Sequence, residues 1–196
     1  MKPYAEACER NQQPILDVLL TEFAAVHHVL EIGSGTGQHA VFFGRAMPHL
    51  VWQTSDLSEN HAGIRAWVEG AGLVNVRLPL VLDVLGEWPE PGFDAVFSAN
   101  TAHIMSWPAV TAMFAGVGQR LPPGGLLALY GPFSESGRQV SASNAAFDQW
   151  LRARDPASGI RDIEALDALA RSAGLVFRRK HLMPANNRIL VWQREN

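Results

Sequence analysis

Alternating glycines in one short turn constrain the fold of this chain more than any other segment. The largely apolar segment 28–32, which contains Glu31, leads into Gly33, Gly35 and Gly37, and an amphipathic stretch over residues 38–47 follows at once. Glycine adopts left-handed φ values without strain and lets a ligand approach the backbone closely. A strand, a glycine turn and a helix in this order indicate the start of a nucleotide-binding βαβ unit.

The spacing of these glycines separates two classes of ligand. A dinucleotide fingerprint has glycines at relative positions one, three and six, but here they stand at one, three and five, and Gln38 occupies position six. The run therefore resembles the first motif of the Rossmann-like S-adenosylmethionine (SAM) methyltransferases, whose turn faces an amino-acid moiety. A glycine-rich turn without a ligand is the alternative. The motif predicts that the SAM-binding residues include Glu31, Gly33, Ser34, Gly35 and Gly37.

Composition limits the class of protein. The 196 residues are 47% hydrophobic, which suits one domain over 1–196. The resemblance to SAM methyltransferases implies that the N-terminal helical segment 1–25 lids the cofactor. The net charge of −3 and the lack of a basic stripe disfavour nucleic acid. The single cysteine, Cys8, excludes an internal disulfide, and no apolar run approaches the ~20 residues of a membrane span. We expect a cytoplasmic protein without a metal site, since the histidines show no metal-ligand spacing.

Predicted strands alternate with predicted helices along the chain. Strands are expected at 28–32, 50–55, 75–82, 93–98 and 126–130, with a last pair at 175–181 and 188–193. Helices are expected at 11–25, 38–47, 58–71, 109–121, 145–154 and 163–173. Pro79 indicates an edge position or a bulge for its strand. The pattern predicts an α/β, doubly wound, mainly parallel sheet with helices on both faces.

Residues that follow the strands are the candidates for ligand contact, because ligands bind outside the carboxyl ends of such a sheet. Asp56 lies 19 positions after Gly37, where an acidic residue holds the ribose hydroxyls. Capping of the next helix by Asp56 or Ser58 is the alternative.

Residues that follow the next two strands are further candidates for the cofactor site. Asp83 and Val84 together suit the amino group and the ring of adenine, although Asp83 before Gly86 is also typical of a turn. Asn100 follows the fourth strand and is assigned to the cofactor as well.

Longer strings of the sequence resemble the DUF938 family of SAM-dependent methyltransferase-like proteins. The family-specific strings are NTAHI at 100–104, YGPF at 130–133 and PANN at 184–187, supported by ERN at 9–11 and WQTSD at 52–56. Thr54 departs from the family pattern, where proline is expected, without affecting Asp56. The resemblance implies a Rossmann-like, seven-stranded sheet with a reversed last strand and names no substrate.

Two residues are candidates for catalysis. His103 lies just after the fourth strand and titrates near neutrality, so it is the first candidate for a general base. Tyr130 is the second candidate. A structural hydrogen bond is the alternative for His103.

Other residues are candidates for substrate contact or for the lid. Tyr130 and Phe133 are expected to wall a substrate pocket, with core packing as an equal alternative for Phe133. Arg161 suits an anionic group of the substrate or cofactor. The sequence also assigns Asn186 and Asn187 to the substrate, with a turn as the alternative for this pair. Asn11, which would otherwise cap the first helix, is assigned to the cofactor.

These features favour a SAM-dependent methyltransferase that acts on a small molecule and yields S-adenosylhomocysteine (SAH). A non-catalytic SAM-binding or partner-binding module and a protein or nucleic-acid methyltransferase are the alternatives. Gln38 argues against a nicotinamide oxidoreductase. The acceptor atom and the oligomeric state are not assigned.

Overall fold

The computed structural model describes residues 2–195 of the chain. The helices are α1 (Glu6–Glu22), α2 (Gln38–Ala46), α3 (His61–Ala71), α4 (Trp107–Arg120), α5 (Ala142–Arg154) and α6 (Ile163–Ser172), with short 3-10 turns η1 (Ser58–Asn60) and η2 (Pro184–Asn186). The strands are β1 (His28–Ile32), β2 (Val51–Asp56), β3 (Val76–Val81), β4 (Ala95–Ala99), β5 (Leu126–Glu135), β6 (Arg138–Gln139), β7 (Arg161–Asp162), β8 (Leu175–Leu182) and β9 (Asn187–Arg194).

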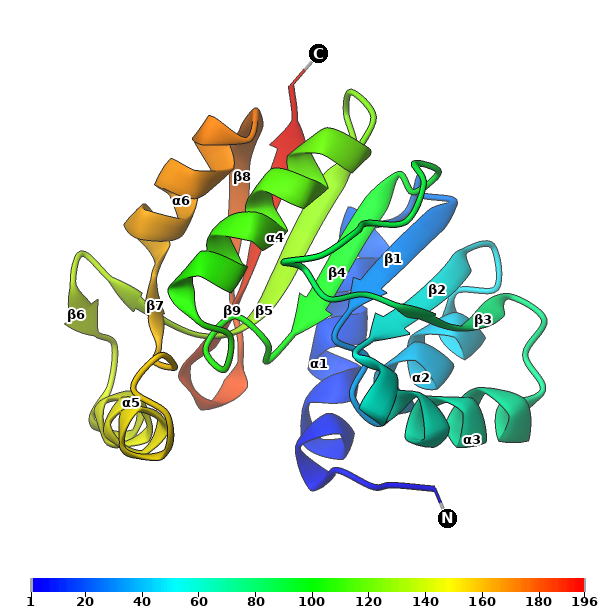
Figure 1. Ribbon diagram of the computed structural model, residues 1–196, viewed down its shortest axis with the longest axis horizontal. Helices are drawn as coiled ribbons and strands as arrows, with labels where there is room; N and C mark the ends of the chain where they lie inside the picture. Colours follow the sequence, from blue (N-terminus) through cyan, green and yellow to red (C-terminus); the bar gives the residue numbers. More distant parts are fainter. Residues whose placement is uncertain (1, 196) are drawn as a thin grey trace.

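The main strands form one sheet in the order β3-β2-β1-β4-β5-β9-β8 (Figure 1). Strands β1 to β5 pair in parallel, whereas β9 runs antiparallel to both β5 and β8. The short strands β6 and β7 pair with the far end of β5. Over residues 2–195, this is the predicted seven-stranded sheet with a reversed last strand, extended by two short strands.

Helices cover both faces of the sheet, as the alternating pattern predicts. On one face α1, α2 and α3 pack on buried side chains of the strands, with Phe43, Trp52 and Phe97 in mutual contact. On the other face α4 and α6 pack on a second cluster, in which Phe114 meets Trp192 edge to face (Figure 1). No helix within residues 2–195 has both the length and the apolarity that a membrane crossing requires.

The first helix begins earlier than the sequence analysis predicts. It starts at Glu6, so Asn11 lies in its interior and does not cap it, and Pro14 is also inside it. The buried face begins only at Ile15, which is why apolar periodicity missed the polar first turns. Ser58 does not cap α3 either, because it opens η1 and makes no side-chain cap.

Strand β3 is the edge strand of the sheet, in agreement with the presence of Pro79. The pairing with β2 changes register between Gln53 and Ser55. Side chains of β2 bridge this irregularity, since Gln53 Nε2 donates to the carbonyl of Leu78 and Thr54 Oγ1 donates to that of Arg77. Thr54, the departure from the family pattern, therefore stabilises the bulge.

The YGPF string lies inside β5, because this strand continues to Glu135 and does not end at residue 130 as predicted. Side chains alternate between faces along a strand, so residues three apart point to opposite faces. Tyr130 accordingly belongs to the cluster under α1 and α2, and Phe133, which is 1% exposed, to the cluster under α4 and α6. The predicted shared wall of Tyr130 and Phe133 is wrong, and Phe133 is a core residue.

Close packing of α4 against the end of α6 yields the first testable prediction. A Cβ added at Gly118 would collide with the backbone carbonyl of Ala173, whereas one at Gly116 would meet the side chain of Trp88. A backbone cannot yield as a side chain does, so we expect Gly118→Ala to destabilise the fold by about 1–3 kcal/mol. Thermal unfolding should show a lower midpoint for Gly118→Ala than for the matched variant Gly116→Ala. Equal midpoints would contradict the backbone clash.

Candidate functional site

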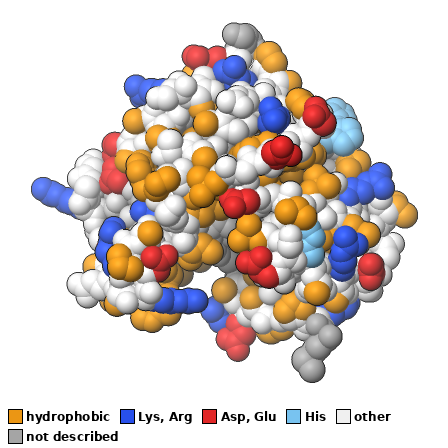
Figure 2. All heavy atoms as spheres, in the orientation of Figure 1, with side chains coloured by type: hydrophobic (Ala, Val, Ile, Leu, Met, Phe, Trp, Pro, Cys, Tyr) orange, Lys and Arg blue, Asp and Glu red, His pale blue; other side chains and the backbone are white. Residues whose placement is uncertain are grey.

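A cavity of about 460 Å³ opens at the carboxyl ends of β1, β2 and β4. Its volume lies within the usual range for small-molecule sites. On the face of the molecule drawn in Figure 2, a hollow is visible in the lower half, with acidic side chains beside it. The polar lining comprises Asp56, Asn60, Asp83, Asn100 and Thr101, and the apolar lining includes Leu57, Leu82, Val84, Ile104 and Met105. We refer to it as the glycine-turn cavity, since Gly33 and Gly35 form its floor.

The three glycines of the turn serve different purposes. All have positive φ, with values of 71° for Gly33, 57° for Gly35 and 88° for Gly37. A Cβ on Gly33 would lie 2.5 Å from Thr101 Cγ2, and one on Gly37 would lie 3.1 Å from the Cα of Ile64. A Cβ on Gly35 would meet nothing within 4 Å. Gly35 therefore faces the open space of the cavity, whereas Gly33 and Gly37 permit close packing of neighbouring segments.

Glu31 and Ser34 lie beneath the turn and do not line its cavity. The buried Glu31 carboxylate accepts hydrogen bonds from Ser34 Oγ at 2.7 Å and from Trp52 Nε1 at 3.1 Å. Burial raises the pKa of Glu31 to about 7, although both hydrogen bonds oppose the shift. These two residues fix the shape of the turn, and the structure gives them no direct access to a ligand.

Asp56 joins the end of β2 to the glycine turn. Its Oδ2 accepts a hydrogen bond from the Gly35 backbone N–H at 2.7 Å, and its Oδ1 accepts from Leu57 N–H and Asn60 Nδ2. A carboxylate offers about four acceptor sites, so one remains for a ligand hydroxyl, and a second hydroxyl would replace Asn60. The helix-capping alternative does not apply, because α3 begins after η1.

Asp83 and Val84 line the same cavity. Asp83 also forms a turn, which is the alternative that the sequence offers to adenine contact. Asp83 Oδ1 accepts from Leu85 N–H at 3.0 Å, and its carbonyl accepts from Gly86 N–H. Val84 is buried in the wall, whereas Asp83 is exposed. The turn and the cavity position are therefore compatible.

A second cavity of about 500 Å³ adjoins the first, and Asn100 lines both. We call it the α1 cavity, because Ala7, Arg10, Asn11 and Pro14 of that helix form one wall. The opposite side comes from Tyr130 and from the turn that contains η2, through Pro184, Ala185 and Asn187. Asn11, assigned to the cofactor from the sequence, thus lies here with Tyr130 and Asn187.

The hydroxyl of Tyr130 is held within this cavity wall. The side chains of Asn11 and Asn187 line the same cavity, and Asn11 Oδ1 lies 2.7 Å from His39 Nε2. Burial raises the pKa of Tyr130 above its ordinary value of 10.0 and outweighs the polar side chains of Asn11 and Asn187, which lower it. The phenol is therefore neutral near pH 7 and suits orientation of a ligand better than removal of a proton.

His103 lines neither cavity, contrary to its predicted role as general base. The side chain is 6% exposed and packs edge to face on Phe147, 5.4 Å between ring centroids. Burial, reinforced by the positive charge of Arg161, lowers its pKa to about 4. The imidazole is buried next to Gly131, where an added Cβ would lie 3.7 Å from His103 Nδ1 and 3.9 Å from Asn100 Oδ1.

Arg161 and Asn186 also lie outside both cavities. The buried guanidinium of Arg161 donates to three backbone carbonyls, those of Ala102, Met105 and Ala157. Its donors stabilise the loop after β4 and are directed at backbone carbonyls, so the structure does not support the predicted anion-binding role. Asn186 is exposed, with a positive φ of 59° that fits the turn alternative.

Several cavity residues were not predicted from the sequence. Asn60 and Met105 reach the glycine-turn cavity from η1 and from the loop after β4, and Thr101 packs on Gly33. Arg10 reaches the α1 cavity. The family string ERN was the only signal for Arg10. Within residues 2–195, His, Cys, Asp and Glu side chains form no group that could hold a metal ion.

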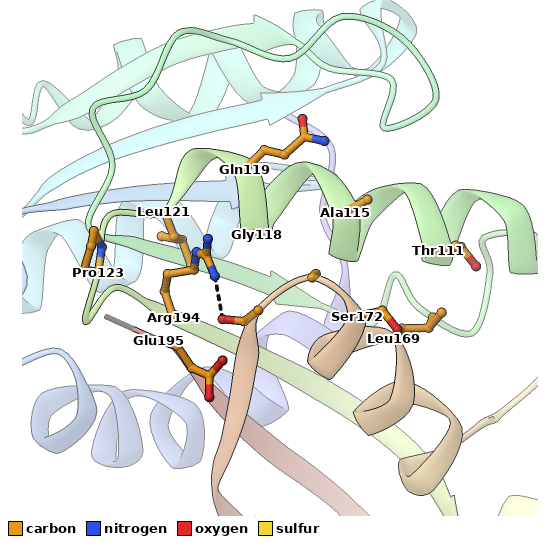
Figure 3. Close-up of a pocket in the computed structure, with 12 residues that line it drawn as sticks. Thr111, Ala115, Gly118, Gln119, Leu121, Pro123, Leu169, Ser172, Arg194 and Glu195 are labelled. Atoms are coloured by element: carbon orange, nitrogen blue, oxygen red, sulfur yellow. Dashed lines mark hydrogen bonds between the residues drawn. The ribbon is translucent and has the colours of Figure 1, made fainter.

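Another pocket, of about 580 Å³, lies at the opposite end of the parallel strands (Figure 3). It is bounded by the ends of α4, α6 and β9, where Arg194 Nη1 donates to the carbonyl of Gly174 at 2.9 Å. Ligands of doubly wound folds bind at the carboxyl ends of the parallel strands. This pocket lies at their amino ends, away from the glycine turn.

Comparison with solved structures identifies the class of fold, that of SAM-dependent methyltransferases. An O-methyltransferase family protein from Burkholderia thailandensis superposes with a TM-score of 0.84 at 20% identity, over 97% of this chain and 58% of that one. The apo SAM-dependent methyltransferase SibL gives 0.80 at 24% identity, over 94% and 56%. Human N-acetylserotonin methyltransferase, in complex with SAM, gives 0.79 at 15% identity, over 97% and 53%.

The present chain thus spans a little over half the length of these structures. Within this class, the chain belongs to the family described as protein of unknown function (DUF938), whose model matches residues 2–194. The resemblance inferred from the NTAHI, YGPF and PANN strings is confirmed.

Glu31 yields a prediction of pH-dependent stability. Its pKa is raised from 4.5 in the unfolded chain to about 7 in the fold. Its contribution to stability is complete below pH 4.5 and is lost as the pH rises toward 7, because the unfolded state releases the proton first. Glu31→Gln keeps an acceptor for Ser34 and Trp52 and removes the titration.

The unfolding midpoint of Glu31→Gln should therefore rise relative to that of the native chain between pH 4.5 and 7. Above pH 7 the difference between the two midpoints should stay constant. The gain should correspond to roughly 1–3 kcal/mol. Thermal unfolding monitored by circular dichroism across this range measures it. Parallel curves for the two proteins would show that Glu31 ionises normally in the fold.

Proposed function

We propose that the chain is a SAM-dependent methyltransferase acting on a small-molecule acceptor. The observation that carries the proposal is the pair of adjoining cavities that share Asn100, one built on the glycine turn and the other beneath α1. Two connected sites at the carboxyl edge of the sheet suit a reaction between two ligands. The SAM-bound human methyltransferase and the SAH-bound PigF among the similar structures support the choice of cofactor.

The residues of the glycine-turn cavity fit the parts of SAM. Asp56 has a free acceptor site for a ribose hydroxyl, and the open face of Gly35 accommodates the amino-acid moiety. Leu82 and Val84 provide apolar surface for the adenine ring, beside the exposed carboxylate of Asp83. When bound, SAM supplies an electrophilic methyl group on a sulfonium ion. The chain's own contribution is to bind, to orient and to exclude water.

Binding of the cofactor is tested directly by titration calorimetry. SAM and SAH should bind to the glycine-turn cavity, and NADH should not, because Gln38 replaces the third glycine of a dinucleotide fingerprint. NADH binding without a SAM signal would contradict the proposal. SAM binding without turnover over a broad acceptor panel would instead favour the non-catalytic alternative.

Asp56→Ala should weaken SAM binding by about 1–3 kcal/mol, or about 5- to 150-fold in Kd, as expected when a charged hydrogen-bond partner is removed. Asp94→Ala is the matched control. Asp94 accepts hydrogen bonds from the backbone N–H groups of His27 and His28 at the opposite edge of the sheet. Both variants should lose stability, but only Asp56→Ala should lose SAM affinity. If Asp56→Ala bound SAM as tightly as the native chain, the role of Asp56 would be purely structural.

A further inference from the structure

The lining of the α1 cavity restricts the charge of its ligand. Arg10 is the cationic side chain there, and among the described residues no aspartate or glutamate joins it in the lining. The remaining polar groups are the amides of Asn11, Asn100 and Asn187 and the phenol of Tyr130. Arg10 is largely exposed at the rim, where Glu6 lies 3.2 Å away as a solvent-screened partner. A rim cation above neutral donors attracts small anions and disfavours cations.

The lining also restricts the chemistry of the methyl acceptor. An alcohol, a phenol or a protonated amine must lose a proton on methylation, which calls for a nearby base. Within residues 2–195, no carboxylate or imidazole lines the α1 cavity; burial raises the pKa of the Tyr130 phenol, and the guanidinium of Arg10 has no acceptor for a proton. His103 and Cys8 stand outside the lining. Asp56 and Asp83 line the other cavity and are absent from the lining of this one.

A carboxylate satisfies both restrictions, because it is anionic and already deprotonated at neutral pH. We propose, resting on the proposed function, that the α1 cavity takes a small organic carboxylate whose oxygen is the methyl acceptor. The oxygen lone pair forms the new O–CH₃ bond while the S–CH₃ bond breaks with its electron pair to sulfur. The products are a methyl ester and SAH, and no proton is released or taken up.

Asn100 is the residue placed to orient such an acceptor, since it belongs to the lining of both cavities. A neutral amide donor can hold one carboxylate oxygen without the full charge of a guanidinium. This matters because the carboxylate loses its charge during transfer, and a strong ion pair would stabilise the reactant more than the transition state. Arg10 at the rim therefore attracts the anion, while neutral groups hold it at the site of reaction.

The test uses the whole chain with saturating SAH and measures binding before any turnover. Benzoate and octanoate are titrated in parallel with benzamide and octanamide. The carboxylates should bind at least about fivefold more tightly than their amides. Arg10→Gln should weaken the carboxylates by roughly threefold at low salt and leave the amides unchanged. Arg171→Gln is the control, because Arg171 is also an exposed helical arginine paired with an acidic residue four positions earlier.

Turnover is then followed with SAM by mass spectrometry of the esters and by a pH indicator. A carboxylate acceptor gives a methyl ester without proton release, whereas an alcohol, phenol or amine releases one proton per methyl group. Amides that bind as tightly as carboxylates, no binding of either with SAH bound, or one proton per transfer would each overturn the inference and leave SAM binding intact. Failure of SAM and SAH to bind would instead overturn the proposed function.

Discussion

A buried set of hydrogen bonds between the ends of β1 and β2 is the constraint on which the site depends. Ser34 N–H donates to the carbonyl of Ser55 at 3.0 Å, and Ser55 Oγ donates to the carbonyl of Glu31 at 2.6 Å. Ser34 Oγ accepts from Ser55 N–H while it donates to the Glu31 carboxylate. Buried polar groups without partners are costly, so the set holds only as a whole. It fixes the turn such that Gly35 N–H meets Asp56.

Local signals account for the parts of the fold that the sequence predicts well. Apolar runs bounded by turn residues located each strand of the main sheet to within a few residues. Strands buried on both faces need such continuous apolar runs. The exception is the far end of β5. That end, residues 131–135, passes through a glycine and a proline, which by local rules end a strand. Pairing with β7 and β9 keeps it extended, and those partners come from distant parts of the chain.

The site residues divide in the same way. The glycines and Asp56 were found because their roles follow from backbone conformation and spacing. His103 and Arg161 were assigned chemistry from residue type, yet their roles are set by neighbours from other segments. Arg161 bonds to carbonyls of residues 102 and 105, more than 50 positions earlier, and α5 brings Phe147 against His103. The α1 cavity joins four separate segments of the chain, so no local pattern predicts it.

Asn100 connects the fold to the chemistry through its backbone as well as its side chain. Its φ is 60°, a conformation that asparagine and glycine adopt far more readily than other residues. The backbone is held there by the N–H of Asn100, which donates to the carbonyl of Tyr130 at 2.9 Å. Glycine would satisfy the backbone but remove the amide between the two cavities, and a larger side chain would be strained. Asparagine is therefore the residue that allows β4 to turn away from the sheet and still present a neutral hydrogen-bonding group where the two cavities meet.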